Sequence, residues 1–190
     1  MEQLDVEDIP LKLTREDELQ AAESWFADRE ILPGPSPMSW NSNLTRRDVT
    51  VALYRLAGSP KVELPAFSPY ADVATSDPDY AAYIWARQKG ITFGWADGKF
   101  HPDAPLSTPS TVAFLYRYQK ATGNQDAPQS SDGWQHQVRK GSAFWREAQW
   151  AVDYRMWGYR VDGEYPYEGF DNSSISSGDF ALMLYRMEHG

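Results

Sequence analysis

The stretch LSTPSTVAFLYR at residues 106–117 carries a pattern that the chain repeats at residues 44–55 (LTRRDVTVALYR) and 175–186 (ISSGDFALMLYR). In each stretch an aliphatic residue and a hydroxyl residue are followed, at the same spacing, by Leu-Tyr-Arg. Apolar residues recur between these ends at the three- and four-residue steps of a helix that buries one face. The pattern therefore predicts three amphipathic helices, each beginning at the hydroxyl residue, which is a favourable N-cap.

A tryptophan precedes each of these stretches and marks a further helix in every copy. The three tryptophans are Trp25, Trp85 and Trp150. In the middle copy, Asp77 and Pro78 suit the N-cap and the first position of a helix that stops at Gly90. Each copy is thus predicted to be helix, loop, helix, with its tryptophan in the core. Because a two-helix unit buries only one face of each helix, three units should share one core.

The predicted fold class is all-α, with three helix-loop-helix repeats forming one pseudo-threefold, three-pronged body. The predicted repeats span residues 1–60, 61–124 and 125–190. The arginine of each Leu-Tyr-Arg falls in the last helical turn, where a cation interacts favourably with the free carbonyls and the helix dipole. These arginines are Arg55, Arg117 and Arg186. We expect them to be structural rather than ligand contacts.

Charge and composition exclude several classes of protein. The net charge is −9, with 18 Lys and Arg against 27 Asp and Glu, which argues against nucleic acid as a partner. No apolar run is long enough for membrane insertion, and the acidic start MEQLDVEDIP is unlike a secretory signal. We therefore expect either a mature fragment or a protein that is delivered by other means.

The sequence gives no sign of catalysis, of a cofactor or of a metal centre. Cysteine is absent, which removes thiol chemistry and Cys-ligated metals. No nucleophile elbow, zinc-binding His-Glu-x-x-His or Walker-type phosphate loop is present. Asp97, Asp103 and Asp162 lack the alternating oxygen ligands of a calcium loop. We expect a protein that is not an enzyme.

The middle copy resembles a module of the S-layer homology (SLH) family, in the form typical of actinobacterial surface proteins. The motifs that carry the resemblance are, in order, Tyr70-Ala71-Asp72-Val73, Ala82-Tyr83-Ile84-Trp85-Ala86, Gly90-Ile91-Thr92-Phe93-Gly94-Trp95, Asp97-Gly98-Lys99-Phe100-His101-Pro102 and the helix Val112 to Arg117. The first and third copies are degenerate but keep the helix anchors. The resemblance implies a cell-surface protein that binds a secondary cell-wall polysaccharide, often a pyruvylated one, through the grooves between its three modules and is so anchored to the wall.

The resemblance also implies a polysaccharide-binding site. The family's ligand arginine matches Arg46, directly after the probable N-cap Thr45, whereas Thr108 and Ser177 occupy the corresponding positions of the other copies. A guanidinium suits bidentate contact with an acidic sugar substituent, although Arg46 is equally suited to be a solvated first-turn arginine. Trp95, in a loop, is the best candidate for stacking on a sugar ring. Three further motif residues complete the predicted site: Asp72, Gly94 and Asp97.

Two points stay open from the residues alone. Asp97-Gly98 has a counterpart in Asp162-Gly163, which favours a purely structural turn. An alternative function is an SLH-derived protein-protein interaction or assembly module that has lost sugar binding and has protein partners in place of a polysaccharide. Such a module could be a domain of a longer surface protein, or a phage-borne or intracellular protein. An open pocket around Arg46 would favour sugar binding, whereas an Arg46 paired with an acid such as Asp48 would favour assembly.

Overall fold

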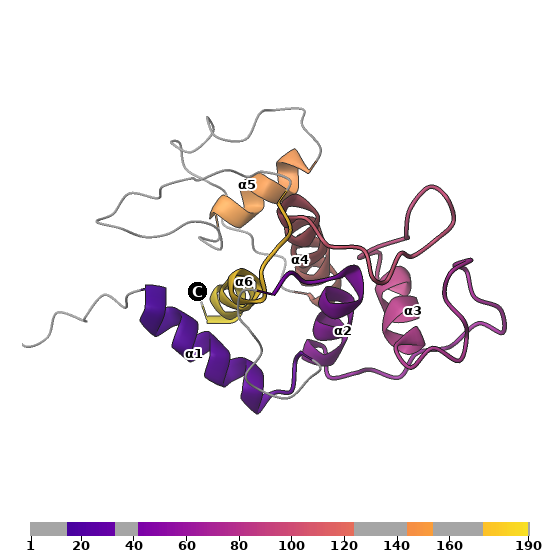
Figure 1. The fold of residues 1–190 in the computed structure, drawn as a ribbon, viewed down its shortest axis with the longest axis horizontal. Coiled ribbons are helices and arrows are strands. Elements are labelled where there is room, and N and C mark those ends of the chain that lie inside the picture. The colour runs from indigo at the N-terminus through magenta and orange to yellow at the C-terminus, as the bar shows by residue number, and fades with distance from the viewer. Residues whose placement is uncertain (1–14, 33–41, 124–143, 154–172, 190) are drawn as a thin grey trace, which may run out of the picture.

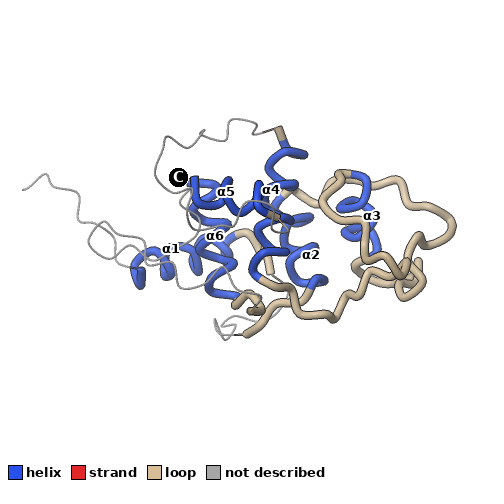
Figure 2. Tube along the Cα trace, turned by 90° about the horizontal axis from the view of Figure 1, so that it is seen from above, coloured by secondary structure: helices blue, strands red, loops and turns tan. Residues whose placement is uncertain are grey.

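The computed structural model describes residues 15–32, 42–123, 144–153 and 173–189. Within these ranges the regular structure consists of helices without any strand (Figures 1 and 2). The helices are α1 (Arg15–Asp28), α2 (Arg46–Leu56), α3 (Tyr80–Gln88), α4 (Thr108–Thr122), α5 (Trp145–Asp153) and α6 (Ser177–His189). The all-α prediction is confirmed for this part of the chain. The Asp162-Gly163 turn lies outside the described residues.

The second helix of each predicted copy begins directly after the expected hydroxyl residue. Thr45 caps α2 with a capping box, in which its Oγ1 accepts from the Asp48 amide (3.2 Å) and its own amide donates to Asp48 Oδ2 (2.8 Å). Ser176 Oγ likewise accepts from the Asp179 amide at 3.1 Å. Ser107 makes no such bond, and α4 instead has a proline in its first turn.

The first helix of the middle copy begins later than predicted. The sequence indicated a start at Asp77-Pro78, but α3 begins at Tyr80. Asp77 forms a separate turn instead, because its Oδ1 accepts from the Asp79 amide (2.9 Å) and its carbonyl accepts from the Tyr80 amide (3.0 Å). The prediction of Asp77 and Pro78 as the N-cap and first residue of the helix was therefore wrong, because they form a turn that precedes it.

The segments that lead into α2, α4 and α6 meet in the middle of the molecule (Figure 1). Their aliphatic residues form a closed ring of backbone hydrogen bonds: Leu44 N donates to Ile175 O (3.0 Å), Ile175 N to Leu106 O (2.9 Å) and Leu106 N to Leu44 O (2.9 Å). All three side chains are buried. The equally spaced aliphatic residues of the sequence pattern thus lie at one place in the fold.

A second ring of hydrogen bonds flanks the first, with donors two residues after the aliphatic residue of each segment and acceptors two residues before it. Its bonds are Arg46 N to Ala104 O (3.0 Å), Thr108 N to Ser173 O (2.9 Å) and Ser177 N to Ser42 O (2.8 Å). Each bond uses the first amide of a helix, a group that has no partner inside its own helix. The two rings therefore join the starts of three helices and satisfy buried polar groups at the same time.

Helices from different predicted copies pack against one another. α2 packs on α3, α4 on α5, and α1 on α6. The predicted core tryptophans Trp25, Trp85 and Trp150 are 8%, 3% and 5% exposed, which confirms their assignment to the core. Within the described ranges, each first helix is thus covered by the second helix of another copy, and the larger apolar core draws on all three predicted copies.

The Leu-Tyr-Arg arginines link these helices. Arg55 Nη1 donates to the Glu30 carbonyl (3.1 Å) and Arg117 Nη1 to the Ile91 carbonyl (3.2 Å), both in turns that follow a first helix. Arg186 pairs with the Glu18 carboxylate on α1. These contacts agree with the structural role expected of them.

A smaller apolar cluster lies beside this core, around α3 and its flanking loops (Figure 1). Its members are Tyr70, Val73, Tyr80, Tyr83, Ile84 and Phe100. Tyr83 and Phe100 are fully buried, with ring centroids 4.3 Å apart. This cluster fixes the loops on which most of the predicted site residues lie.

Candidate functional site

Arg46 lies in the contact between α2 and the loop that follows α3. Its side chain is buried, and the residue is 6% exposed. Nε donates to the Phe100 carbonyl (2.8 Å) and Nη2 donates to Thr92 Oγ1 (2.9 Å). The guanidinium also lies over the rings of Phe100 and Phe114, with centroids 5.1 and 5.3 Å away. Arg46 therefore holds the loop at both Thr92 and Phe100 against α2.

The charge of Arg46 is stabilised without an ion pair to any carboxylate of the described residues. Burial lowers the pKa of its guanidinium, while the nearby negative charge of Asp72 opposes that shift. An arginine stays protonated at neutral pH even so. The two hydrogen bonds and the two aromatic faces take the place of water around the cation. This arrangement is neither the open pocket nor the pair with Asp48 that the sequence suggested, since Asp48 is engaged by Thr45.

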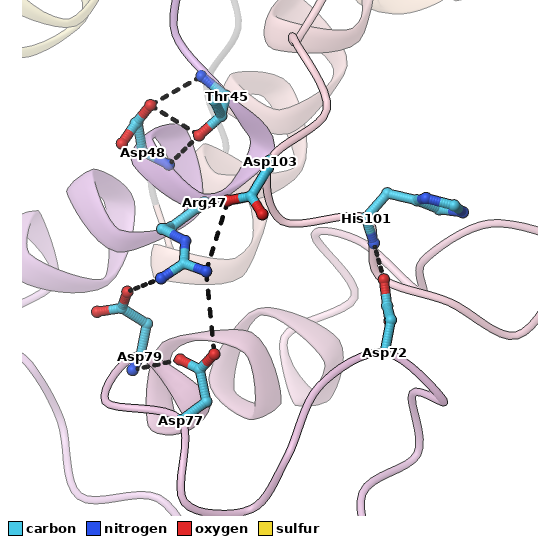
Figure 3. Close-up of polar contacts among 8 residues, drawn as sticks. All are labelled: Thr45, Arg47, Asp48, Asp72, Asp77, Asp79, His101 and Asp103. Atoms are coloured by element: carbon cyan, nitrogen blue, oxygen red, sulfur yellow. Dashed lines mark hydrogen bonds and ion pairs between the residues drawn. The ribbon is translucent and has the colours of Figure 1, made fainter.

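Asp72 organises the same loop from the other side. Its carboxylate accepts from the backbone amides of Phe100 (2.7 Å) and His101 (2.8 Å), and Figure 3 shows the second of these bonds. Partial burial raises the pKa of Asp72, but the two amide hydrogen bonds outweigh it and hold the pKa below its ordinary value. Asp72 thus fixes the peptide groups on both sides of Phe100, and Arg46 also holds the second of them through the Phe100 carbonyl.

Gly94 allows a tight turn within the loop. Its φ of +81° is in the left-handed region, and an added Cβ would lie 2.5 Å from the Lys99 carbonyl oxygen and 2.9 Å from the Tyr70 ring. The following residue closes the turn, because Trp95 N donates to Lys99 O at 2.8 Å. Only glycine combines this backbone conformation with such close approach.

Trp95 and His101 form an exposed aromatic surface on this loop. Trp95 is 52% exposed, and its ring centroid lies 4.1 Å from that of His101. His101 Nε2 lies 2.7 Å from Asp97 Oδ2, and the Asp97 carboxylate also accepts from the Lys99 amide at 3.0 Å. The hydrogen bond with His101 lowers the pKa of Asp97. We call Trp95, Asp97 and His101 the loop platform, an aromatic face with hydrogen-bonding groups at its edge.

Two further residues of this region, His101 and Arg47, were not predicted as site residues from the sequence. The spacing of Asp97 and His101 was the available signal for the first. Arg47 lies near three carboxylates, Asp77 (4.0 Å), Asp79 (3.4 Å) and Asp103 (3.5 Å) (Figure 3). These acids come from two segments distant from Arg47 in sequence, so no local pattern could indicate the cluster.

The carboxylates around Arg47 set its electrostatic state. Burial lowers the pKa of the guanidinium, but the surrounding negative charges outweigh it and raise the pKa above its ordinary value. Because Arg47 is partly exposed, each such ion pair contributes at most about 1 kcal/mol. The cluster therefore fastens α2 to the turn before α3 mainly through its number of partners.

The predicted site residues fall into two groups. Arg46, Asp72 and Gly94 hold the loop in place, whereas Trp95 and Asp97 lie on its exposed side. Thr45 is engaged in the cap of α2. The counterparts of Arg46 in the other copies, Thr108 and Ser177, are 2% and 0% exposed. Arg46, Thr108 and Ser177 are therefore all buried where the starts of α2, α4 and α6 contact neighbouring segments.

A search of curated proteins finds no similar sequence. Among the described residues, no helix is long and apolar enough to cross a membrane, and no group of three or more acidic or histidine side chains is placed to hold a metal ion. The S-layer homology domain family matches residues 69–107, the region that contains Asp72, Gly94 and the loop platform. Residues 69–107 therefore correspond to an S-layer homology domain, and such domains are associated in general with cell-wall anchoring.

Proposed function

We propose that this chain is a non-catalytic module that anchors a protein to the cell wall by binding a secondary cell-wall polysaccharide. We further propose that residues 1–60, 61–124 and 125–190 are three SLH-like copies arranged about a pseudo-threefold axis. The two hydrogen-bond rings support this arrangement, because corresponding residues of the three segments donate and accept in cyclic order. The packing of each first helix on the second helix of another copy has the same cyclic order.

The observation that carries the binding proposal is the loop platform within residues 69–107. A sugar ring presents C–H groups on its face and hydroxyls at its edge, so it is complementary to an aromatic face flanked by acceptors. Trp95 supplies such a face, and Asp97 and His101 supply polar atoms beside it. The loop is held by Arg46 and Asp72, so little ordering is needed when a ligand binds.

Within this proposal, Arg46 positions the loop. With 6% of the residue exposed and its guanidinium bonded to Thr92 and Phe100, Arg46 has little surface left for a ligand. Direct contact between Arg46 and an acidic or pyruvylated sugar stays a prediction. A positioning role predicts that polysaccharide binding weakens on Arg46→Ala through displacement of Trp95, and that Arg46→Lys restores part of it.

The test is calorimetric titration of the whole chain with a purified, pyruvylated secondary wall polysaccharide. We expect Trp95→Ala to lose most of the binding, because stacking on an aromatic ring contributes about 1–3 kcal/mol. Phe67→Ala is the matched control, since Phe67 is an 86% exposed aromatic outside the matched region. A parent protein that gives no binding, or a Trp95→Ala variant that binds as tightly as the parent, would refute the proposal.

A protein-protein assembly module is the second candidate, and its support is the set of large apolar side chains that the described residues expose within residues 61–124. Four large apolar residues are exposed there: Leu64 (49%), Phe67 (86%), Phe93 (63%) and Trp95 (52%). Sedimentation of the chain over a range of concentrations distinguishes the two functions. Self-association that Phe67→Ala and Phe93→Ala reduce, without any polysaccharide binding, would favour assembly.

A further inference from the structure

We propose that a pocket at the C-terminal ends of α1, α2 and α6 binds a carboxylate-bearing sugar unit. The pocket has a volume of about 480 Å³ and is lined by Trp25, Arg29, Arg55, Leu56, Glu188 and His189. That volume lies within the range of small-molecule sites. This proposal depends on the proposed function in one respect, namely that the sugar would be an acidic unit of the wall polysaccharide. The pocket is a different site from the loop platform, since the two share no residue.

Two guanidinium groups supply the positive charge of the pocket. Arg29 lies over the Trp25 ring, 4.9 Å from its centroid. Arg55 is oriented by the hydrogen bond from its Nη1 to the Glu30 carbonyl, which leaves Nε and Nη2 without a partner among the described residues. Neither arginine is ion-paired with a carboxylate in the described part of the chain. Two such cations stand out in a protein with a net charge of −9.

The lack of an acid beside Arg55 has a structural cause. Its counterparts at the ends of α4 and α6 both pair with an acid on the helix that packs against them, Arg117 with Glu147 and Arg186 with Glu18. α3, which packs on α2, has the sequence YAAYIWARQ and contains no acidic residue. Of the three equivalent arginines, Arg55 is therefore the one that no carboxylate of the described residues neutralises, and its charge remains available to a ligand.

Hydrogen-bond acceptors lie beside these cations. His189 Nδ1 is 2.8 Å from the Tyr185 carbonyl, and since a carbonyl can only accept, Nδ1 carries the proton. In the neutral imidazole, Nε2 is then an acceptor. The imidazole ring of His189 stacks on the Tyr185 ring, with centroids 4.3 Å apart, and makes an edge contact with the Trp25 ring, with centroids 5.5 Å apart. The Glu188 carboxylate adds further acceptors to the lining.

This combination selects one class of ligand. A carboxylate is suited to the guanidinium donors of Arg29 and Arg55. Sugar hydroxyls are suited to His189 and Glu188, which accept hydrogen bonds. The phosphate of a sugar phosphate carries about two negative charges where a carboxylate carries one, so Glu188 would repel the phosphate more strongly. A neutral sugar would leave both guanidiniums without their counter-ion. The pocket therefore favours a polyhydroxylated monoanion such as a uronic acid.

The experiment titrates the full chain with D-glucuronate, D-glucose and glucose 6-phosphate, followed by calorimetry and by the indole NH signals in the NMR spectrum. We expect D-glucuronate to bind at least about tenfold more tightly than the other two, since D-glucose cannot form a charge-assisted hydrogen bond with the arginines and glucose 6-phosphate is repelled more strongly by Glu188. Arg29→Gln should reduce that affinity about tenfold. Its matched control is Lys89→Gln, an exposed cation at the C-terminal end of α3 that does not line the pocket.

Each result decides the proposal. Selective binding of D-glucuronate that is lost in Arg29→Gln and kept in Lys89→Gln and Trp95→Ala supports it. Equal affinity for D-glucose, tighter binding of glucose 6-phosphate, absence of binding, or an unaffected Arg29→Gln overturns it. Because Trp95→Ala is expected to leave glucuronate binding unchanged, failure of the loop-platform proposal and failure of this one are distinguishable.

Discussion

The contact between α2 and the 92–101 loop differs from the contact at the start of α4, although both surround the same backbone rings. Arg46 and Thr108 each donate a backbone amide to a neighbouring segment. The side chain of Arg46 also reaches and holds a distant loop, whereas Thr108 Oγ1 reaches the Ser173 carbonyl (3.3 Å), close to the ring itself. Backbone hydrogen bonds thus join the starts of the helices. At the start of α2, the long side chain of Arg46 also holds the 92–101 loop in place.

Replacing Arg46 with alanine should have the largest effect on stability. Arg46→Ala leaves the buried Phe100 carbonyl and Thr92 hydroxyl without this donor and removes both aromatic contacts. We expect a loss of about 3–5 kcal/mol in the free energy of unfolding, measured by urea denaturation. Thr108→Ala, the matched control, loses one hydrogen bond and should cost about 1 kcal/mol. If the two variants lost the same free energy of unfolding, the side chain of Arg46 would stabilise the protein no more than that of Thr108 does.

Gly94 provides the next largest effect. Gly94→Ala introduces both a strained φ of +81° and a contact of 2.5 Å with the Lys99 carbonyl, so we expect a loss of about 2–3 kcal/mol and weaker polysaccharide binding. Gly98→Ala separates the two causes, because Gly98 has a φ of +77° but no atom within 4 Å of an added Cβ. Its cost should be about 1 kcal/mol. Similar unfolding curves for the two variants would mean that the backbone shifts the Lys99 carbonyl away from the added Cβ without loss of stability.

The helix caps give a smaller difference between the copies. Thr45→Ala removes a capping box and should destabilise the protein by about 1 kcal/mol. Ser107→Ala removes no capping bond, since the Ser107 side chain donates to Ser110 Oγ at 3.0 Å instead, and should change the stability by less than about 0.5 kcal/mol. Thermal unfolding of both variants measures the contrast, and a Ser107→Ala loss as large as that of Thr45→Ala would contradict it.

The features that could be predicted from the sequence are those that depend on neighbouring residues. The positions of the hydroxyl caps, the buried tryptophans and the aliphatic residues of the ring follow from periodicity and capping preference, which act over one or two helical turns. The start of α3 was placed too early because Asp77 and Pro78 suit a turn as well as they suit a helix start.

The surroundings of Arg46 could not be predicted in the same way. Its partners Thr92 and Phe100 are 46 and 54 positions away in the sequence, and whether a first-turn arginine meets solvent or a loop depends on tertiary packing. The pairing of helices between copies is hidden for the same reason, because each helix has an apolar face that fits more than one partner. The loop platform was found only in part, since the contact of Trp95 with His101 requires the turn at Gly94 to form first.

The smallest effect is the pH dependence that Asp72 gives to the loop. The pKa of Asp72 is lowered in the folded protein, so its carboxylate adds stability above its unfolded pKa of about 4 and loses that contribution as the pH falls through the lower folded pKa. Asp72→Asn keeps the shape of the side chain but removes the charge. The difference in unfolding free energy between the parent and Asp72→Asn should therefore shrink as the pH is lowered from about 7 to below about 4. Urea denaturation at several pH values measures this difference, and a difference that stays constant would mean that the amides of Phe100 and His101 are held as well by a neutral oxygen as by a charged one.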